Sequence, residues 1–140
     1  MPTLHLGVID QPYQTGKTTG DVAEILESKY KVMEHFATAH EADIAGDLEN
    51  SLEGELENLL LGAPRSGDPF AAACSAIDDR FRKFLSQKEM DRMGVPGVPT
   101  AASLAGYSKR FKQKQKKSRG PRPSFIDTSL YSNSFHSWID

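Results

Sequence analysis

The run TGKTT, residues 15–19, is the first stretch whose residue types could do chemistry, because glycine, lysine and hydroxyl groups before a helix can hold a phosphate. A complete phosphate-binding loop needs another glycine five residues before Gly16, so that successive backbone amides face the phosphates. That position holds Gln11, and no later apolar strand ends in an aspartate that could bind magnesium. The run therefore predicts a turn and a helix N-cap, and it disfavours nucleotide hydrolysis.

Other candidates for catalysis or metal binding do not form a site in the sequence. The four histidines are scattered: His5, His35, His40 and His136. His35 and His40 are five residues apart, whereas two metal ligands on one helix face prefer a spacing of four. Asp78 and Asp79 are adjacent and diverge on a helix, and the lone Cys74, in AAACSA, is typical of helix packing. No serine lies in a nucleophile-elbow pattern. We expect a protein that is not an enzyme and needs no cofactor or metal.

A basic segment carries the strongest binding signal. Between residues 109 and 122 there are eight basic side chains and no acidic one: Lys109, Arg110, Lys112, Lys114, Lys116, Lys117, Arg119 and Arg122. The other nine Lys and Arg stand against 19 Asp and Glu, so the rest of the chain is strongly acidic. Such a segment binds phosphates with a steep salt dependence, or it binds an acidic protein surface. The acidic remainder favours a protein partner over DNA, and both alternatives stay open.

The elements that position this segment are predicted to be mainly α-helical, with minor β-structure at both ends. A chain of 140 residues with 38% hydrophobic residues suits one compact domain. No apolar run approaches the roughly 18 residues of a membrane span, and the N-terminus lacks a signal-peptide pattern. We expect a soluble intracellular protein with no membrane partner. Residues 3–9 alternate apolar and polar side chains, which predicts a half-buried strand.

Residues 21–61 predict a long amphipathic helix, because apolar side chains recur at spacings of three and four without a proline. Thr18 or Thr19 with Asp21 supplies the start, and Gly62 followed by Pro64 supplies the stop. The segment is either one helix of about 60 Å, at ~1.5 Å per residue, or two joined near residues 37–41. It holds eleven acidic residues against two lysines. Its negative face is either simply solvated or binds a basic partner, such as the basic segment of a neighbouring copy.

A second amphipathic helix is predicted after Asp68 and Pro69, which form an N-cap and a first helical residue. Its apolar stripe comprises Phe70, Ala73, Cys74, Ile77, Phe81, Phe84 and Leu85. Ser86 with Glu89 matches a capping box for a short helix that ends at Gly94. Thr100 then caps a helix over residues 101–111.

The last residues predict a docking tail. Thr128 can cap one helical turn, and FHSWID, residues 135–140, reads as a strand at an edge or one completed by a partner. We expect partner contacts from five apolar side chains: Phe125, Leu130, Tyr131, Phe135 and Trp138. The chain therefore divides into a helical core domain with a short N-terminal strand at 1–106, a basic arm at 107–123 and a docking tail at 124–140.

Several segments together resemble a known protein group. GDVAEILESKYKVMEHF, DPFAAACSAIDDRFRKFLSQKEMD, GVPGVPTAASLAGYSKRFK and RPSFIDTSLYSNSFHSWID are similar in order to small virion structural proteins of contractile-tailed bacteriophages, notably neck and tail-completion proteins of the head-tail connector and virion-morphogenesis group. In that group a long helix and a basic stretch precede a short motif. Its matching residues here are Asp127, Thr128, Leu130 and Ser134, with Ser129 where glycine is usual.

The resemblance implies a structural virion protein that assembles as an oligomeric ring in the neck or tail, as a tail-completion, terminator or collar protein, with no catalytic residues. The partners would be copies of itself and neighbouring virion proteins, after assembly in the host cytoplasm. A position at the baseplate or along the tail tube is the main alternative. A second alternative is a DNA-contacting role, with the basic arm facing DNA in the channel.

Overall fold

Two strands from opposite ends of the chain pair to form one face of the fold. β1 (Leu4–Val8) and β2 (Phe135–Ile139) are antiparallel, with Leu4 opposite Ile139 and Val8 opposite Phe135. The computed structural model describes residues 1–13, 16–64, 67–106, 120–126 and 129–140. Within these residues the two strands form a two-stranded sheet and the other elements are helices, which confirms the predicted mainly α fold with minor β-structure. Both predicted strands are present, and β2 is completed by its own chain.

The acidic segment forms three helices instead of one or two: α1 (Thr19–Tyr30), α2 (Val32–Ala39) and α3 (Glu41–Leu60). The break at His40 falls within the predicted joint. The break at Lys31 was not predicted, because lysine rarely adopts the left-handed φ of 52° found there. The Glu27 carboxylate accepts hydrogen bonds from the backbone amides of Met33 (2.8 Å) and Glu34 (3.0 Å), and so satisfies amides at the start of α2.

The predicted start and stop of the acidic segment are confirmed. Thr18 Oγ1 accepts from the Asp21 amide (3.2 Å), and Asp21 Oδ2 accepts from the Thr18 amide (2.9 Å), which is a complete capping box. α3 ends at Leu60, and Gly62 follows with a positive φ of 76°.

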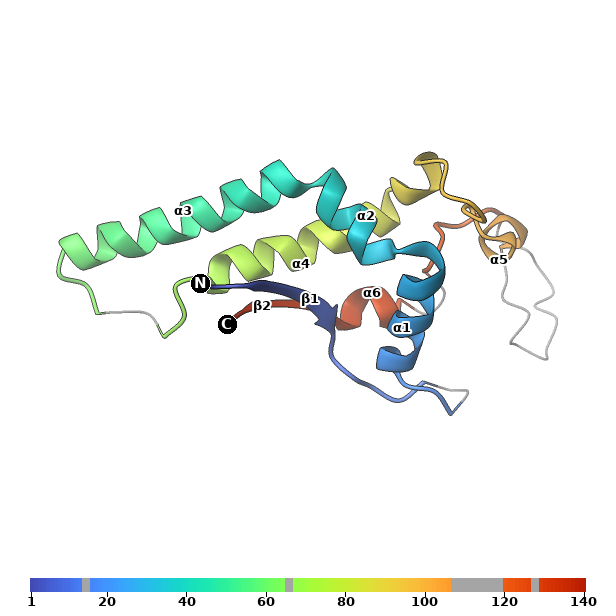
Figure 1. Cartoon of the computed structure of the whole chain (residues 1–140), viewed down its shortest axis with the longest axis horizontal. Coiled ribbons are helices and arrows are strands. Elements are labelled where there is room, and N and C mark those ends of the chain that lie inside the picture. Colours follow the sequence, from blue (N-terminus) through green and yellow to red (C-terminus); the bar gives the residue numbers. More distant parts are fainter. Residues whose placement is uncertain (14–15, 65–66, 107–119, 127–128) are drawn as a thin grey trace.

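α4 (Ala71–Ser86) runs antiparallel to α3 and packs on the sheet (Figure 1). The predicted apolar stripe faces the core, and the helix begins two residues later than expected. The predicted capping box of Ser86 and Glu89 is wrong. Ser86 Oγ donates back to the Lys83 carbonyl (3.2 Å), and the Glu89 carboxylate lies 2.8 Å from His40 Nε2. Only a short 3₁₀ turn, η1 (Met90–Arg92), follows.

The core is an aromatic cluster built where α2, α4 and the end of the chain meet. Phe81 of α4 stacks on Phe135 of β2 with ring centroids 3.8 Å apart, and Phe36 of α2 meets Phe81 edge-on at 5.2 Å. Phe84 and Tyr131 complete the cluster. Because the aromatic rings come from distant parts of the sequence, their packing joins the C-terminal segment to the helical body.

Two short helices complete the fold: α5 (Ala101–Ala105), at the end of the molecule away from the α3–α4 loop, and α6 (Leu130–Ser134), beside α1 (Figure 1). Thr100 caps α5 as predicted, since its Oγ1 accepts from the Ser103 amide (3.2 Å). α5 ends at Ala105, and Gly106 follows with a left-handed φ of 71°. Residues 107–111 of the helix predicted over 101–111 lie outside the described residues, as does Thr128. Ser129 has a left-handed φ of 61°, the conformation that glycine adopts most readily.

Candidate partner-binding surfaces

The predicted basic arm is described only at its end. Lys109, Arg110, Lys112, Lys114, Lys116, Lys117 and Arg119 lie outside the described residues. Arg122 is anchored by its backbone amide, which donates to the Ser103 carbonyl (2.9 Å), and its guanidinium donates to the Ile126 carbonyl. A Cβ at Gly106, whose φ is +71°, would lie 2.4 Å from the Gly120 carbonyl oxygen. The two ends of the basic segment are therefore attached side by side, next to α5.

The apolar residues of the predicted docking tail pack mostly within their own chain. Tyr131 and Phe135 are 2% and 1% exposed, so they support the fold instead of offering a surface to a partner. Leu130 is half-buried at the start of α6. Phe125 is half-buried too, and its ring lies 5.2 Å from that of Tyr30. The sequence predicted that these side chains contact partners, whereas in the structure they pack against their own chain.

Trp138 is the most exposed side chain of the five, at 43%. Its ring stacks on His5 of the paired strand, with centroids 5.2 Å apart and planes 12° from parallel. It also covers Gly7, where an added Cβ would lie 3.0 Å from the indole ring. His5 Nε2 lies 3.0 Å from Asp140 Oδ1. The indole is thus held flat on the outer face of the sheet by its own chain.

A buried polar cluster joins β2 to α4. Asp78, 8% exposed, accepts from the Ser137 amide (2.8 Å), and its carboxylate lies 2.7 Å from Ser137 Oγ and 3.2 Å from His136 Nδ1. Ser137 Oγ also lies 3.0 Å from the Cys74 carbonyl. The hydroxyl faces the carboxylate and a carbonyl instead of the imidazole, so this is not the serine–histidine relay of a nucleophilic enzyme. Its evident role is to satisfy buried polar groups.

The described part of the chain contains neither a metal-binding group of side chains nor a membrane-spanning helix. No group of three or more His, Cys, Asp or Glu side chains there could hold a metal ion. None of the helices there is long and apolar enough to cross a membrane. Burial raises the pKa of the Cys74 thiol, which disfavours the reactive thiolate.

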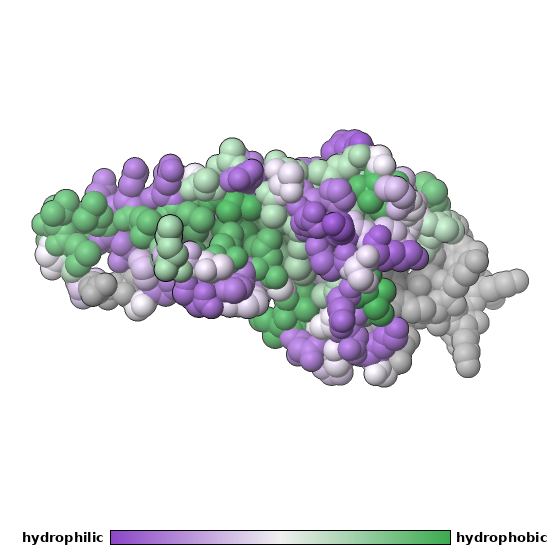
Figure 2. Space-filling view, in the orientation of Figure 1, coloured by the Kyte–Doolittle hydropathy of each residue, from purple (hydrophilic) through white to green (hydrophobic). Residues whose placement is uncertain are grey.

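The outer half of α3 exposes a row of leucines, which we call the leucine end: Leu52, Leu56, Leu59, Leu60 and Leu61. Leu56 is 58% exposed and Leu60 79%. Figure 2 shows hydrophobic residues gathered at this end of the molecule. The row continues the stripe of Ile44, which is buried, and Leu48, which is half-buried against the core. The helix therefore carries apolar side chains beyond the point where its own chain covers them, as an interaction surface does.

Acidic side chains accompany the leucine end. α3 holds seven acidic residues and neither Lys nor Arg. Two of them, Asp43 and Asp47, lie 3.5 and 2.8 Å from the Arg80 guanidinium of α4. The remaining five have no ion-pair partner within the described residues: Glu41, Glu49, Glu53, Glu55 and Glu57. The leucine end is thus an apolar row with a negative border, and it can bind a partner that is apolar at its centre and positive at its rim.

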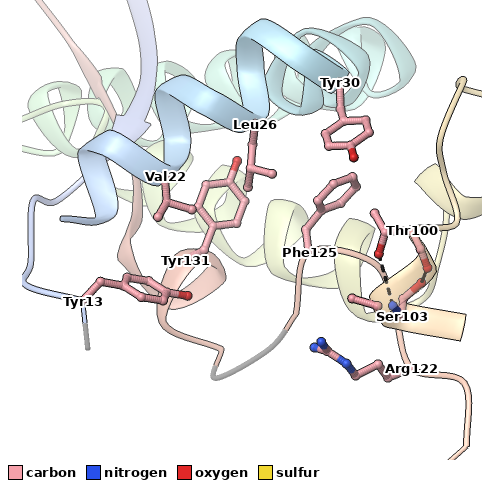
Figure 3. A pocket seen from close by; sticks show the side chains of 10 residues that line it. Tyr13, Val22, Leu26, Tyr30, Thr100, Ser103, Arg122, Phe125 and Tyr131 are labelled. Carbon is pink, nitrogen blue, oxygen red and sulfur yellow. Dashed lines mark hydrogen bonds between the residues drawn. The ribbon is translucent and has the colours of Figure 1, made fainter. Parts of the chain in front are cut away.

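A pocket of about 270 Å³ lies near the other end of the molecule, between α1, α5 and α6 (Figure 3). We call it the aromatic pocket. Its described lining is Tyr13, Val22, Leu26, Tyr30, Thr100, Ala102, Ser103, Arg122, Phe125 and Tyr131. In Figure 3, Tyr30 and Phe125 form one wall, Tyr13 and Tyr131 form another, and the Arg122 side chain extends toward the space between them. No acidic residue is among these lining residues, so the pocket is apolar with a positive edge.

One polar atom in this lining is unusual. The Tyr131 hydroxyl is buried and has no hydrogen-bond partner among the described residues. Burial is also the main cause of the raised pKa of Tyr131, so the hydroxyl keeps its proton and remains a donor. Buried donors are nearly always paired in native proteins. The Tyr131 hydroxyl is therefore a buried group that the described residues leave unpaired.

Sequence reasoning identified the acidic helix face and Arg122, but it missed the leucine end and the aromatic pocket. A signal for the leucine end existed, because Leu59, Leu60 and Leu61 form an apolar triplet at the predicted helix end. No local signal marks the pocket, whose walls come from five separate segments. Comparisons with protein-family models, curated proteins and solved structures find no match to the chain.

Proposed function

We propose that the protein is a non-enzymatic structural subunit that assembles with copies of itself through the leucine end of α3. The observation that carries this proposal is the change of environment along one helical stripe, from buried Ile44 to exposed Leu56 and Leu60. A further copy is the occupant we favour, because the chain combines an acidic helix with a basic segment of eight charges. Each copy can therefore supply the charge that attracts the next one.

The expected strength of one such contact is modest. Burying a leucine side chain fully contributes about 1.5–3 kcal/mol, so two or three leucines give several kcal/mol before the loss of translational and rotational freedom is subtracted. A single contact is thus expected to be weak. An assembly in which every copy makes two contacts is much stronger, because later contacts form at a high effective concentration.

The setting we propose is the neck or tail of a tailed-bacteriophage virion, as an oligomeric ring. This part of the proposal rests on the sequence resemblance described above. A subunit with two different contact surfaces suits such a ring, since head-to-tail contacts close when the rotation per copy permits. The baseplate or the tail tube remains the alternative location.

The test is to replace Leu56 and Leu60 with aspartate and to measure association by analytical ultracentrifugation. Both side chains are largely exposed, so the double variant is expected to keep its circular dichroism and melting temperature. The wild type should show concentration-dependent association, and the double variant should remain a monomer over the same range. Met93→Asp, at a side chain 40% exposed away from α3, is the matched control and should associate like the wild type. Equal association of wild type and double variant would refute the proposal.

The basic segment supports DNA contact as a second candidate function. Eight positive charges within fourteen residues would bind duplex DNA with an affinity that falls steeply as salt rises. Replacing Lys112, Lys114, Lys116 and Lys117 with glutamate should abolish this binding. If the wild type does not bind duplex DNA at low salt, the DNA-contacting role is excluded and the protein contact remains.

A further inference from the structure

We propose that the leucine end of α3 inserts into the aromatic pocket of the next copy, so that the subunits associate head to tail. This inference rests on the proposed function, and it adds the identity of the receiving surface. The proposal joins the exposed leucine row of one copy to the apolar pocket of another.

The size and chemistry of the two surfaces match. A cavity of roughly 150 Å³ holds a benzene ring, so a pocket of about 270 Å³ has room for about two leucine side chains. The walls that would receive them are aromatic and aliphatic, including Val22, Leu26 and Phe125. Side chains four residues apart on a helix lie on one face, so Leu56 and Leu60 can enter together.

The charges of the two surfaces are opposite. Glu53 and Glu57 lie one turn before Leu56 and Leu60, so they border the entering face. The Arg122 side chain lines the pocket and carries a positive charge. A glutamate that follows the leucines into the contact would therefore meet positive charge.

The two surfaces lie at opposite ends of the long axis of the molecule (Figure 1). One copy therefore does not fill its own pocket, and the contact joins different copies. Because the two surfaces differ, the contact is heterologous. A linear chain of subunits therefore keeps one unused leucine end at one of its ends and one unused pocket at the other. Repetition gives a ring or a filament instead of a closed pair.

Mixing variants tests this arrangement. The tip variant carries Leu56→Asp and Leu60→Asp and retains an intact pocket. The pocket variant carries Ala102→Trp, which fills the cavity while leaving α3 intact, and Arg122→Glu serves as a second pocket variant in case the tryptophan disturbs the fold. The tip variant and Ala102→Trp should each be monomeric by analytical ultracentrifugation, and Arg122→Glu should associate more weakly than the wild type. An equimolar mixture of tip and pocket variants should form 1:1 heterodimers and nothing larger, because only one productive pair of surfaces remains.

The outcomes separate this inference from the proposed function. If the tip variant loses association while both pocket variants assemble like the wild type, the leucine end binds elsewhere, and only this inference is overturned. The same holds if both kinds of variant are monomeric and their mixture forms no heterodimer. If the tip variant assembles normally, the proposed function fails as well. Arg122→Glu alone should weaken association at least about tenfold at low salt and less at high salt, since screening reduces the charge contribution.

Discussion

The two halves of α3 carry the same pattern of apolar residues in different surroundings. In the inner half, Ile44 is buried and Leu48 is half-buried against α4 and the core. In the outer half, Leu52, Leu56 and Leu59 continue at the same helical spacing but are about half exposed. Periodicity shows that a helix has an apolar face, and it does not show whether the chain itself covers that face.

This difference assigns separate tasks to the two halves. The inner half is expected to determine whether the protein folds, because its side chains lose contact with water in the monomer. The outer half is expected to contribute little to the stability of the monomer and much to association.

The largest expected effect on folding comes from the inner half. Ile44→Ala removes buried methyl groups and leaves a cavity, so it should lower the free energy of unfolding by about 2–5 kcal/mol. Leu56→Ala removes exposed methyl groups and should change it by less than about 0.5 kcal/mol. Urea denaturation followed by circular dichroism measures both values. Similar losses of unfolding free energy for the two variants would show that the outer half is also covered in the monomer, and would contradict its assignment to association.

Much of the fold follows from local sequence. The helix start at Thr18 or Thr19 with Asp21, the stop at Gly62, the stripe of α4 and both strands were predicted, because each depends on residues within a few positions of one another. The breaks and contacts that depend on distant residues were not. The turn at Lys31 is held by Glu27, which caps α2 from the preceding helix, and Glu89 contacts His40 instead of capping the next turn.

The candidate surfaces show the same difference between features that depend on local sequence and features that depend on distant residues. The negative face of α3 was predicted from composition, since seven acidic residues without a basic one is a property of the segment itself. The aromatic pocket was not, because Tyr13, Leu26, Ser103 and Phe125 come together only through the packing of α1, α5 and the chain before α6. Tyr131 and Phe135 were predicted to contact partners, although both rings are buried against Phe81 of α4.

A hydrogen bond at the junction of the two halves should have an intermediate effect. Ser51 Oγ donates to the Pro69 carbonyl (2.7 Å) and ties α3 to the residues before α4. Ser51→Ala should lower the free energy of unfolding by about 0.5–1.5 kcal/mol. Thermal and urea denaturation measure the change.

Ser75→Ala, at an exposed position in α4, is the control for the small gain in helix propensity that any Ser to Ala change brings. If the two variants are equally stable, the Ser51 bond contributes nothing to folding, and the junction between the halves lies nearer to Leu48.

The smallest expected effects come from two glycines that lie one in each half of α3. An added Cβ would meet no atom within 4 Å at Gly46 or at Gly54. Alanine should therefore stabilise the helix at either position by about 0.5–1 kcal/mol, by lowering the entropy of the unfolded chain.

The gain in global stability is scaled by the fraction of native molecules in which the local turn is helical. Because the outer half has few covering contacts, Gly54→Ala should raise the global free energy of unfolding less than Gly46→Ala, and it should slow amide exchange mainly in residues 50–60. Equal global gains would mean that the outer half unfolds together with the core, and the division between folding and association along this helix would then have to be placed beyond Gly54.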